Sequence, residues 1–551
     1  MPLRLSKPDQ EFRNPLLFAG EAKSIDLYRV LLNLFMLIKY HGARPVARPG
    51  RKSVTIDTVI RQLVKREADG VVRGFEGNEE KVRWWVMTNL VDLVNRGNPE
   101  KEAVVSLRAI HLNSYKYRNP NHARDYNISE QVFNMLQVAQ TKDLIGKLRD
   151  FLGQGWNTLT NALDTSDAID LDTLGILRIV EKEMAKEQPS GDHVFRPMPC
   201  VCPGQAKVFA DDVRRLLVYR QAIPRHVLLE YLRTLIGLHV GLYLFKLFKM
   251  LPDWVQRGQR DPACLNCLTN EEADLPYQEC PYHCEFMVDC SSNPQSDMAS
   301  LAEDDAAYYY ARIHDYIRAT FSINMALQYL SKTDSKRMED IDDALSAIKN
   351  GGANWDEYFK IRRQNLFANL KDSEQEETLE VFKPILDLGL SNFETFIELV
   401  TQARASFHFK YHKELLDSLF QSNRENGIIW QGRSRRHRRR FWLSPRMLET
   451  MVQLSVLKSH KNGDGGARYS SEPILIDSFI QWMEARYGLI VNGVDKDRFR
   501  SAGIVVHQAF RNNLVSLKER LREIGFFSVL SDAYIMQRIR PRYHIENGGD
   551  A

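Results

Sequence analysis

The chain has 551 residues and lacks a hydrophobic run long enough to cross a membrane. Its most apolar stretch, Thr234 to Phe245, has 12 residues, whereas a membrane-spanning helix needs about 20. We therefore expect a buried core helix there and no membrane partner. The beginning of the chain also lacks the apolar run of a signal peptide, because Pro8, Asp9 and Glu11 interrupt it. Both absences predict a cytoplasmic protein.

The sequence also lacks the short motifs of common enzyme classes. It has no G-x4-G-K-[ST] phosphate loop, no G-x-G-x-x-G fingerprint, no H-E-x-x-H and no G-x-S-x-G. His314 and Asp315 form an adjacent His–Asp pair, but a lone dipeptide is expected by chance. The absences favour a non-catalytic protein. Nuclease carboxylate clusters are too degenerate to find by motif, so a divergent metal-dependent or iron–sulfur-containing nuclease is the alternative.

Helical periodicity is what the sequence has in abundance. From Ser24 to Tyr40, for example, Leu27, Leu31 and Leu34 recur on one helical face. The length suggests about three or four domains. We predict a mainly α, multidomain helical protein with a small Cys-rich metal-binding insertion and a C-terminal winged-helix-like domain. The predicted segments are an N-terminal basic helical domain (1–125), a central helical domain (126–260), a Cys-rich zinc-binding segment (261–300), an acidic helical domain (301–432) and a basic arm with the winged-helix-like domain (433–551).

Positive charge is concentrated at the two ends of the chain. The net charge is only +4, but residues 1–150 carry +8 and residues 433–551 carry +9, which leaves −13 for the middle. Basic ends favour an anionic partner, and the acidic middle can dock on those ends or on another protein. Chance asymmetry on solvated faces is the alternative interpretation.

Five of the seven cysteines lie within 27 residues. Cys264, Cys267, Cys280 and Cys284 have the spacing C-x2-C-x12-C-x3-C, which can close a tetrahedral zinc site. Cys290 is a substitute ligand. In a reducing cytoplasm such clustering favours metal binding over disulfides, so Zn²⁺ is the predicted cofactor. The x12 stretch carries four carboxylates and would repel phosphate, which favours a structural zinc site over a DNA-reading finger.

The choice of metal and of ligands stays open at this point. An iron–sulfur cluster is the alternative cofactor, because Cys280, Cys284 and Cys290 can also supply thiolates. Unmetallated thiols are a further alternative, and His283 lies among the candidates. Cys200 and Cys202 can join the site from about 60 residues away, but we prefer to interpret that pair as an ordinary loop.

A basic run precedes the C-terminal part. Six arginines fall within eight residues: Arg433, Arg435, Arg436, Arg438, Arg439 and Arg440. Guanidinium groups pair with phosphates, and an aromatic side chain such as Trp442 can stack on bases. The run and Trp442 are therefore predicted to bind DNA or another nucleic acid. A solvated loop, or a site for an acidic protein surface such as this chain's own middle, is the alternative.

The remaining C-terminal pattern is typical of a winged-helix order. Helices are expected at about 445–458, 473–487 and 504–524, followed by two short strands at 526–530 and 534–539.

The stretch LKERLREIGFFSVLSDAYIMQRIRPRY, Leu517 to Tyr543, resembles the ends of accessory proteins of prokaryotic anti-phage defence operons. The family that this stretch resembles is that of a component protein of the methylation-associated defence system. The resemblance implies a DNA-linked restriction complex with a methyltransferase and separate ATPase or nuclease subunits as partners. We therefore predict a non-catalytic nucleic-acid-binding accessory or scaffold subunit of such a complex.

Overall fold

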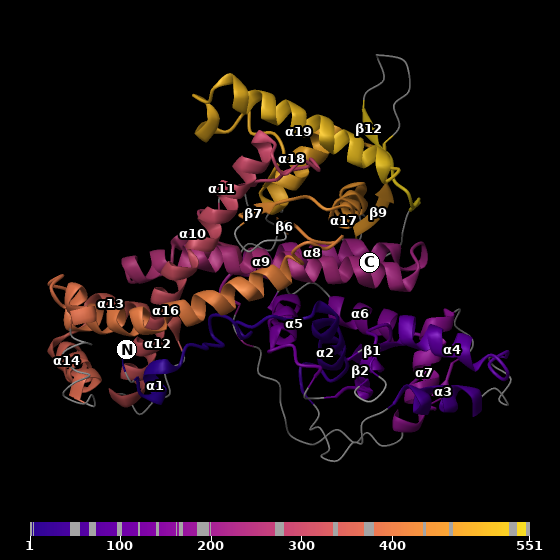
Figure 1. Ribbon diagram of the computed structural model, residues 1–551, viewed down its shortest axis with the longest axis horizontal. Helices are drawn as coiled ribbons and strands as arrows, with labels where there is room; N and C mark the ends of the chain where they lie inside the picture. The colour runs from indigo at the N-terminus through magenta and orange to yellow at the C-terminus, as the bar shows by residue number, and fades with distance from the viewer. Residues whose placement is uncertain are drawn as a thin grey trace.

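The computed structural model is mainly helical, which confirms the mainly α part of the predicted fold class (Figure 1). Its strands are short and pair only in twos within the described part of the chain. The structure describes residues 3, 5–44, 55–65, 73–95, 98, 102–119, 122–138, 143–160, 162–164, 169–184, 198, 200–269, 280–333, 340–368, 380–432, 437–461, 467–527 and 537–546.

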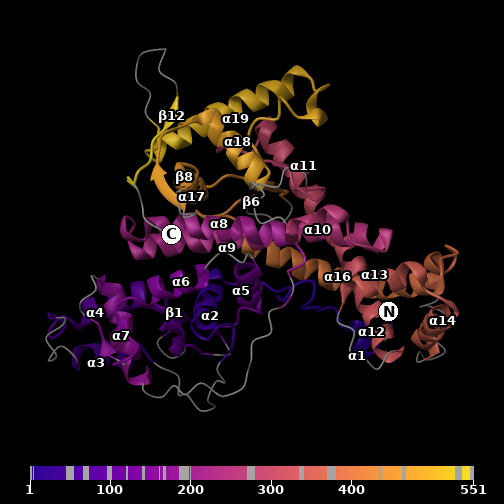
Figure 2. The same cartoon turned by 180° about the vertical axis from the view of Figure 1, so that it is seen from behind.

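Helix α9 (Arg225–Arg257) runs through the middle of the molecule (Figures 1 and 2). Among the described residues it is the one helix long and apolar enough to cross a bilayer, and 94% of its most apolar window is buried inside the fold. The expected core helix lies at its centre. Gly258 ends the helix with a φ of 75°, a left-handed conformation that glycine adopts without a steric penalty.

The N-terminal helices pack on one side of α9, where α2, α5 and α8 contact it. A second, smaller core lies between α3, α4, α7 and the β1–β2 hairpin. The elements of this part are α1 (Lys7–Gln10), α2 (Leu27–Lys39), α3 (Ile56–Lys65), α4 (Glu79–Trp85), β1 (Val91–Val94), β2 (Ala103–Leu107), α5 (Ile128–Val138), α6 (Leu144–Gly153), β3 (Trp156–Asn157), β4 (Ala162–Leu163), α7 (Leu171–Met184) and α8 (Pro203–Val218).

The middle of the chain forms a helical bundle at one end of α9, in which α12 and α16 pack against each other and against α9. Ser391 begins α16 with a capping box, because its side chain and that of Glu394 each bind the other residue's backbone N–H. The elements here are α10 (Pro262–Thr269), β5 (Phe286–Met287), α11 (Asp297–Ala311), α12 (Ile313–Thr333), α13 (Ile341–Asn350), α14 (Ala353–Ala368) and α16 (Asn392–Leu419).

The C-terminal part covers the side of α9 opposite the N-terminal helices (Figure 2). Strand β5 pairs in parallel with β11, and α11 packs against β7 and α19. The C-terminal elements are β6 (Ile429–Gln431), β7 (Arg439–Phe441), α17 (Pro445–Ser455), β8 (Leu457–Lys461), β9 (Ala467–Ser471), β10 (Ile474–Leu475), α18 (Ile476–Tyr487), β11 (Leu489–Ile490), α19 (Ile504–Glu523) and β12 (Arg538–Ile539).

The three expected C-terminal helices are present as α17, α18 and α19. Two antiparallel strand pairs lie in this part of the described chain: β6–β7, which precedes α17, and the β8–β9 hairpin, between α17 and α18. Strand β12, inside the expected strand 534–539, pairs with β10, and the Arg540 N–H just after it donates to the Phe526 carbonyl at 3.0 Å. Most of the expected strand 526–530 and of its connection lies outside the described residues. A winged-helix domain therefore stays a prediction.

One hydrophobic core extends from Leu3 to Ile539 and takes side chains from all five predicted segments. Tyr282 and Phe286 of the cysteine-rich segment belong to it. The segments are therefore held together by shared apolar burial, and their boundaries stay a prediction.

Candidate functional site

Four cysteines from three parts of the chain line one small pocket. Cys202 is the N-cap residue of α8, and Cys264 and Cys267 lie three residues apart on α10. Cys280 forms a further part of the wall. The side chains of Lys246 and Met250 of α9, together with Tyr282, complete much of the lining. The pocket measures about 10 Å³, room for roughly one water-sized occupant.

Contacts around α10 hold this pocket in place. The Lys207 ammonium donates to the Cys267 carbonyl at 2.7 Å, which ties α10 to α8. Asp261 accepts from the Ala263 N–H at 2.9 Å at the start of α10. The thiols line the wall without converging. Among the residues that the structure describes, no three His, Cys, Asp or Glu side chains are gathered closely enough to hold a metal ion.

The surroundings of this pocket raise the pKa values of thiols that line it. Burial, reinforced by the charge of Cys202, raises the pKa of Cys264 to about 12. Burial and Cys202 also raise the pKa of Cys267. Lys246 is only 8% exposed. Burial opposes its charge, but the nearby cysteines, first Cys202 and then Cys280, raise its pKa overall.

The other cysteines lie outside this pocket. The thiol of Cys284, a predicted ligand, is buried and donates to the Tyr282 carbonyl at 3.6 Å. Cys290 is fully buried near Arg520, and burial raises its pKa to about 12. Cys200 donates to Tyr243 at 3.7 Å. The structure thus brings three of the four predicted ligands to one pocket and adds Cys202 to them.

The described part of the arginine run faces the chain's own carboxylates. Arg438 donates to Asp304 at 2.6 Å, and Arg439 forms two hydrogen bonds with Asp417 at 2.7 and 2.6 Å. Arg433, Arg435 and Arg436 lie outside the described residues. The basic run and the acidic middle therefore meet inside one molecule.

Arg440 is the most deeply placed of these arginines. Its side chain is 2% exposed and lies 3.1 Å from Asp289, which is fully buried. Burial lowers the pKa of Arg440 and raises that of Asp289. Trp442 is half-buried and donates its indole N–H to the Ser291 carbonyl at 3.2 Å. These groups join β7 to the segment after β5, and their nucleic-acid role stays a prediction.

Exposed cations gather instead on the β8–β9 hairpin and on β12. Lys458, Ser459 and His460 are all exposed along β8, and Arg468 lies opposite His460 in the register. Arg538 and Arg540 are exposed on and beside β12. The hairpin and β12 lie close together in both views (Figures 1 and 2). Within the described residues no salt bridge joins Lys458, Arg468, Arg538 or Arg540 to a carboxylate; Glu472 lies near the hairpin, 3.7 Å from His460.

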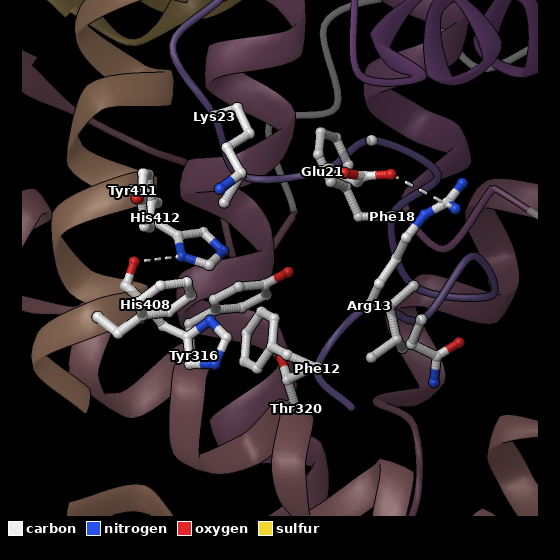
Figure 3. Close-up of a pocket in the computed structure, with 15 residues that line it drawn as sticks. Phe12, Arg13, Phe18, Glu21, Lys23, Tyr316, Thr320, His408, Tyr411 and His412 are labelled. Atoms are coloured by element: carbon white, nitrogen blue, oxygen red, sulfur yellow. Dashed lines mark hydrogen bonds and ion pairs between the residues drawn. The ribbon is translucent and has the colours of Figure 1, made fainter. Parts of the chain in front are cut away.

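A larger pocket of about 170 Å³ lies between the N-terminal segment, α12 and α16 (Figure 3). Phe12 stacks on His408 with ring centroids 4.1 Å apart, and His412 donates its Nδ1–H to the His408 carbonyl at 2.7 Å. Burial lowers the pKa of His408 to about 3 and that of His412 to about 4. Both imidazoles are therefore neutral near pH 7, and the aromatic wall seats the N-terminal segment on the bundle.

A buried polar network joins α8, α9 and α18, and sequence reasoning missed it. Asp212 accepts from Arg486 (2.7 Å), Tyr487 (2.7 Å) and the Nε2 of His239 (2.8 Å). Burial opposes the charge of neighbouring Asp211, but Arg486 and two further arginines hold its pKa at about 2. Asp212 and its three partners are buried and Asp211 is partly exposed, so the network links α8, α9 and α18 inside the fold. The Asp211–Asp212 pair on an apolar helix was its only signal in the sequence.

The fold and these sites define a mainly helical protein in which Arg438, Arg439 and Arg440 of the basic run meet carboxylates of the acidic middle. The chain belongs to the family of methylation-associated defense system protein MAD7, whose family model matches residues 7–543. The predicted membership in a methylation-associated defence system is confirmed, and it extends from the C-terminal stretch to nearly the whole chain. No match to a curated protein was found.

Proposed function

We propose that this defence-system component is a non-catalytic scaffold subunit that contacts nucleic acid through the basic surface of its C-terminal part. The observation that carries the proposal is the basic hairpin surface, which we define as Lys458, Arg468, Arg538 and Arg540. These four side chains are exposed on the β8–β9 hairpin and on or beside β12. When cations without a carboxylate partner pair with nucleic-acid phosphates, the counterions condensed on the nucleic acid are released. This release favours binding.

The scaffold role is supported by how the molecule is built around α9. N-terminal helices cover one side of α9 and the C-terminal part covers the other, so one long helix fixes the positions of both outer surfaces (Figure 1). The Asp212 network adds charged hydrogen bonds across α8, α9 and α18. Family membership supports other defence proteins as the partners that such surfaces would meet.

The proposal assigns no phosphate contact to Arg438, Arg439 or Arg440. Their carboxylate partners Asp304, Asp417 and Asp289 already neutralise them. Releasing Arg440 for a phosphate would leave Asp289 buried without its counter-charge, which is costly. We therefore assign phosphate contacts to the basic hairpin surface and to Arg433, Arg435 and Arg436 of the run.

The test is DNA binding by the full chain, measured by fluorescence anisotropy over a series of salt concentrations. One variant replaces the four residues of the basic hairpin surface by Ala, and a second replaces Arg433, Arg435 and Arg436. Each should bind DNA more weakly than the unmodified chain. The log–log salt slope should fall by roughly 0.9 for each phosphate contact removed.

The matched control replaces four exposed lysines of the acidic middle, Lys332, Lys349, Lys383 and Lys410. It changes the net charge by the same amount as the hairpin variant. Equal weakening by control and hairpin variants would refute a localised site. Unchanged binding in both test variants would refute the assignment, and no binding at low salt would favour a scaffold that contacts proteins alone.

A further inference from the structure

We propose that Cys202, Cys264, Cys267 and Cys280 form a zinc-binding site, in which Cys202 takes the place that sequence spacing assigns to Cys284. This site is independent of the nucleic-acid contacts proposed above. It would fasten α10 and the chain around Cys280 to the beginning of α8.

The first support is the shared pocket. Four thiols from α10, from the start of α8 and from the segment before β5 line the same cavity. Cys264 and Cys267 are three residues apart on one helix and so lie on the same face. Cys202 is the N-cap residue of α8, where the helix dipole favours a thiolate, while burial raises the pKa of its thiol. Four thiolates are a preferred ligand set for structural zinc.

The second support is Lys246, which lines the same cavity from α9. Lys246 is only 8% exposed. Among the residues that the structure describes, none forms a hydrogen bond or salt bridge with its ammonium. A buried ammonium without a partner is costly. A zinc ion with four thiolates carries a net charge of −2, so it would supply the missing counter-charge to Lys246 and would be stabilised by it.

The chemistry of binding is a proton exchange. Zn²⁺ forms four Zn–S bonds, the four thiols release four protons to solvent, and no group is oxidised or reduced. The thiols now stand on the pocket wall without converging, so binding must draw them inward. A cavity of about 10 Å³ suits one ion better than an iron–sulfur cluster, which brings several atoms of its own.

Cys284 is the residue whose role this proposal changes. It lies outside the cavity, in the core with Phe286, and its thiol already donates to the Tyr282 carbonyl. The sequence could not decide whether Cys284 or Cys202 is the zinc ligand, because each of them lies only a few positions from another cysteine.

The experiment is metal analysis of the purified full chain, wild type and single Cys→Ser variants, by elemental mass spectrometry. We expect about one zinc per wild-type chain and a colourless protein. C202S and C267S should lose most of the zinc. C284S should keep the wild-type content, and C200S is the matched control, because Cys200 is also buried and lies two residues from Cys202.

A second measurement uses only the wild-type chain and so does not depend on variants that fold. Cobalt replacing zinc should give the charge-transfer and ligand-field absorption of a tetrathiolate site. Chelation should make Cys202, Cys264, Cys267 and Cys280 more reactive to alkylation, with Cys284 unchanged. Loss of zinc in C284S but not in C202S would overturn the ligand set. Bound iron with a brown colour, or no zinc and no cobalt binding, would overturn the site.

Discussion

Arg440 and Asp289 show how a residue from a basic run becomes part of the core. Arg440 lies on β7, and Asp289 follows β5, so their contact fastens two segments about 150 positions apart. The Arg440 guanidinium also lies 4.5 Å from the centre of the Trp430 ring, which is a cation–π contact. The neighbouring Arg438, by contrast, is 52% exposed in its ion pair with Asp304.

The substitution Arg440→Ala should therefore destabilise the protein by about 3–5 kcal/mol, because it leaves Asp289 as an uncompensated buried charge. Arg438 is half-exposed and pairs with Asp304 and Glu303 near the surface, so Arg438→Ala should cost less than about 1 kcal/mol. Urea unfolding of the full chain measures both. Equal costs for the two variants would contradict the buried role of Arg440.

At this scale the sequence could identify residue types but not their partners. Six arginines in eight residues predict positive charge, yet the sequence does not say which of them meets solvent. That depends on Asp289, Asp304 and Asp417, which fold to the run from up to about 150 positions away. The cysteines present the same problem, because spacing detects Cys264, Cys267 and Cys280 but cannot bring Cys202 to them.

Among the elements, α9 depends on two glycines for its close packing. A Cβ on Gly237 would stand 2.3 Å from the carbonyl oxygen of Leu419 at the end of α16, and 2.8 Å from Leu27 of α2. A Cβ on Gly241 would stand 2.3 Å from the Phe420 ring. Glycine in a helix interior usually destabilises a protein by about 0.5–1 kcal/mol relative to Ala. Glycine is required at these two positions because neighbouring elements approach α9 closely there.

Replacing Gly237 by Ala should thus destabilise the protein by about 1–3 kcal/mol, although Ala is the better helix former, because backbone of α16 would have to move. Gly352→Ala is the control. A Cβ there meets nothing within 4 Å, and the change should stay within about 0.5 kcal/mol. Thermal or urea unfolding compares them. A stabilised G237A variant would contradict the packing between α9 and α16.

The helices of the C-terminal part were predictable as elements, whereas the strand pairings were not. Ser444 and Pro445 mark the start of α17, and Gly488 ends α18, as their positions in the sequence suggest. Strand pairing joins separate segments, as β10 with β12 and β5 with β11 do. Two-residue strands carry too little periodicity to reveal such partners.

Considered as a whole, the molecule holds several histidines in its interior in the neutral form. Burial lowers the pKa of His111 to about 3, that of His408 to about 3 and that of His412 to about 4. In the unfolded chain a histidine takes up its proton near pH 6.5. Between about pH 6.5 and pH 4 the unfolded state therefore binds more protons than the native state, and stability falls as the pH falls.

The free energy of unfolding should decrease on acidification from pH 7 to pH 5, by at most about 1.4 kcal/mol per pH unit for each such histidine. Urea unfolding at several pH values measures the slope. A variant with His408 and His412 replaced by Gln should show a shallower slope. His122, which is exposed, should leave the slope unchanged when replaced by Gln, and a flat profile in the unmodified chain would contradict the prediction.

The sequence by itself determined the helical character of this protein, the buried nature of α9 and its defence-system family, because helical periodicity and family resemblance are written in neighbouring residues. Only the tertiary structure decided which arginines are neutralised, that Cys202 rather than Cys284 lines the pocket with Cys264, Cys267 and Cys280, and how β10 and β12 pair. These outcomes depend on contacts between residues tens to hundreds of positions apart. Such contacts are selected by the packing of whole elements around α9, which no local pattern records.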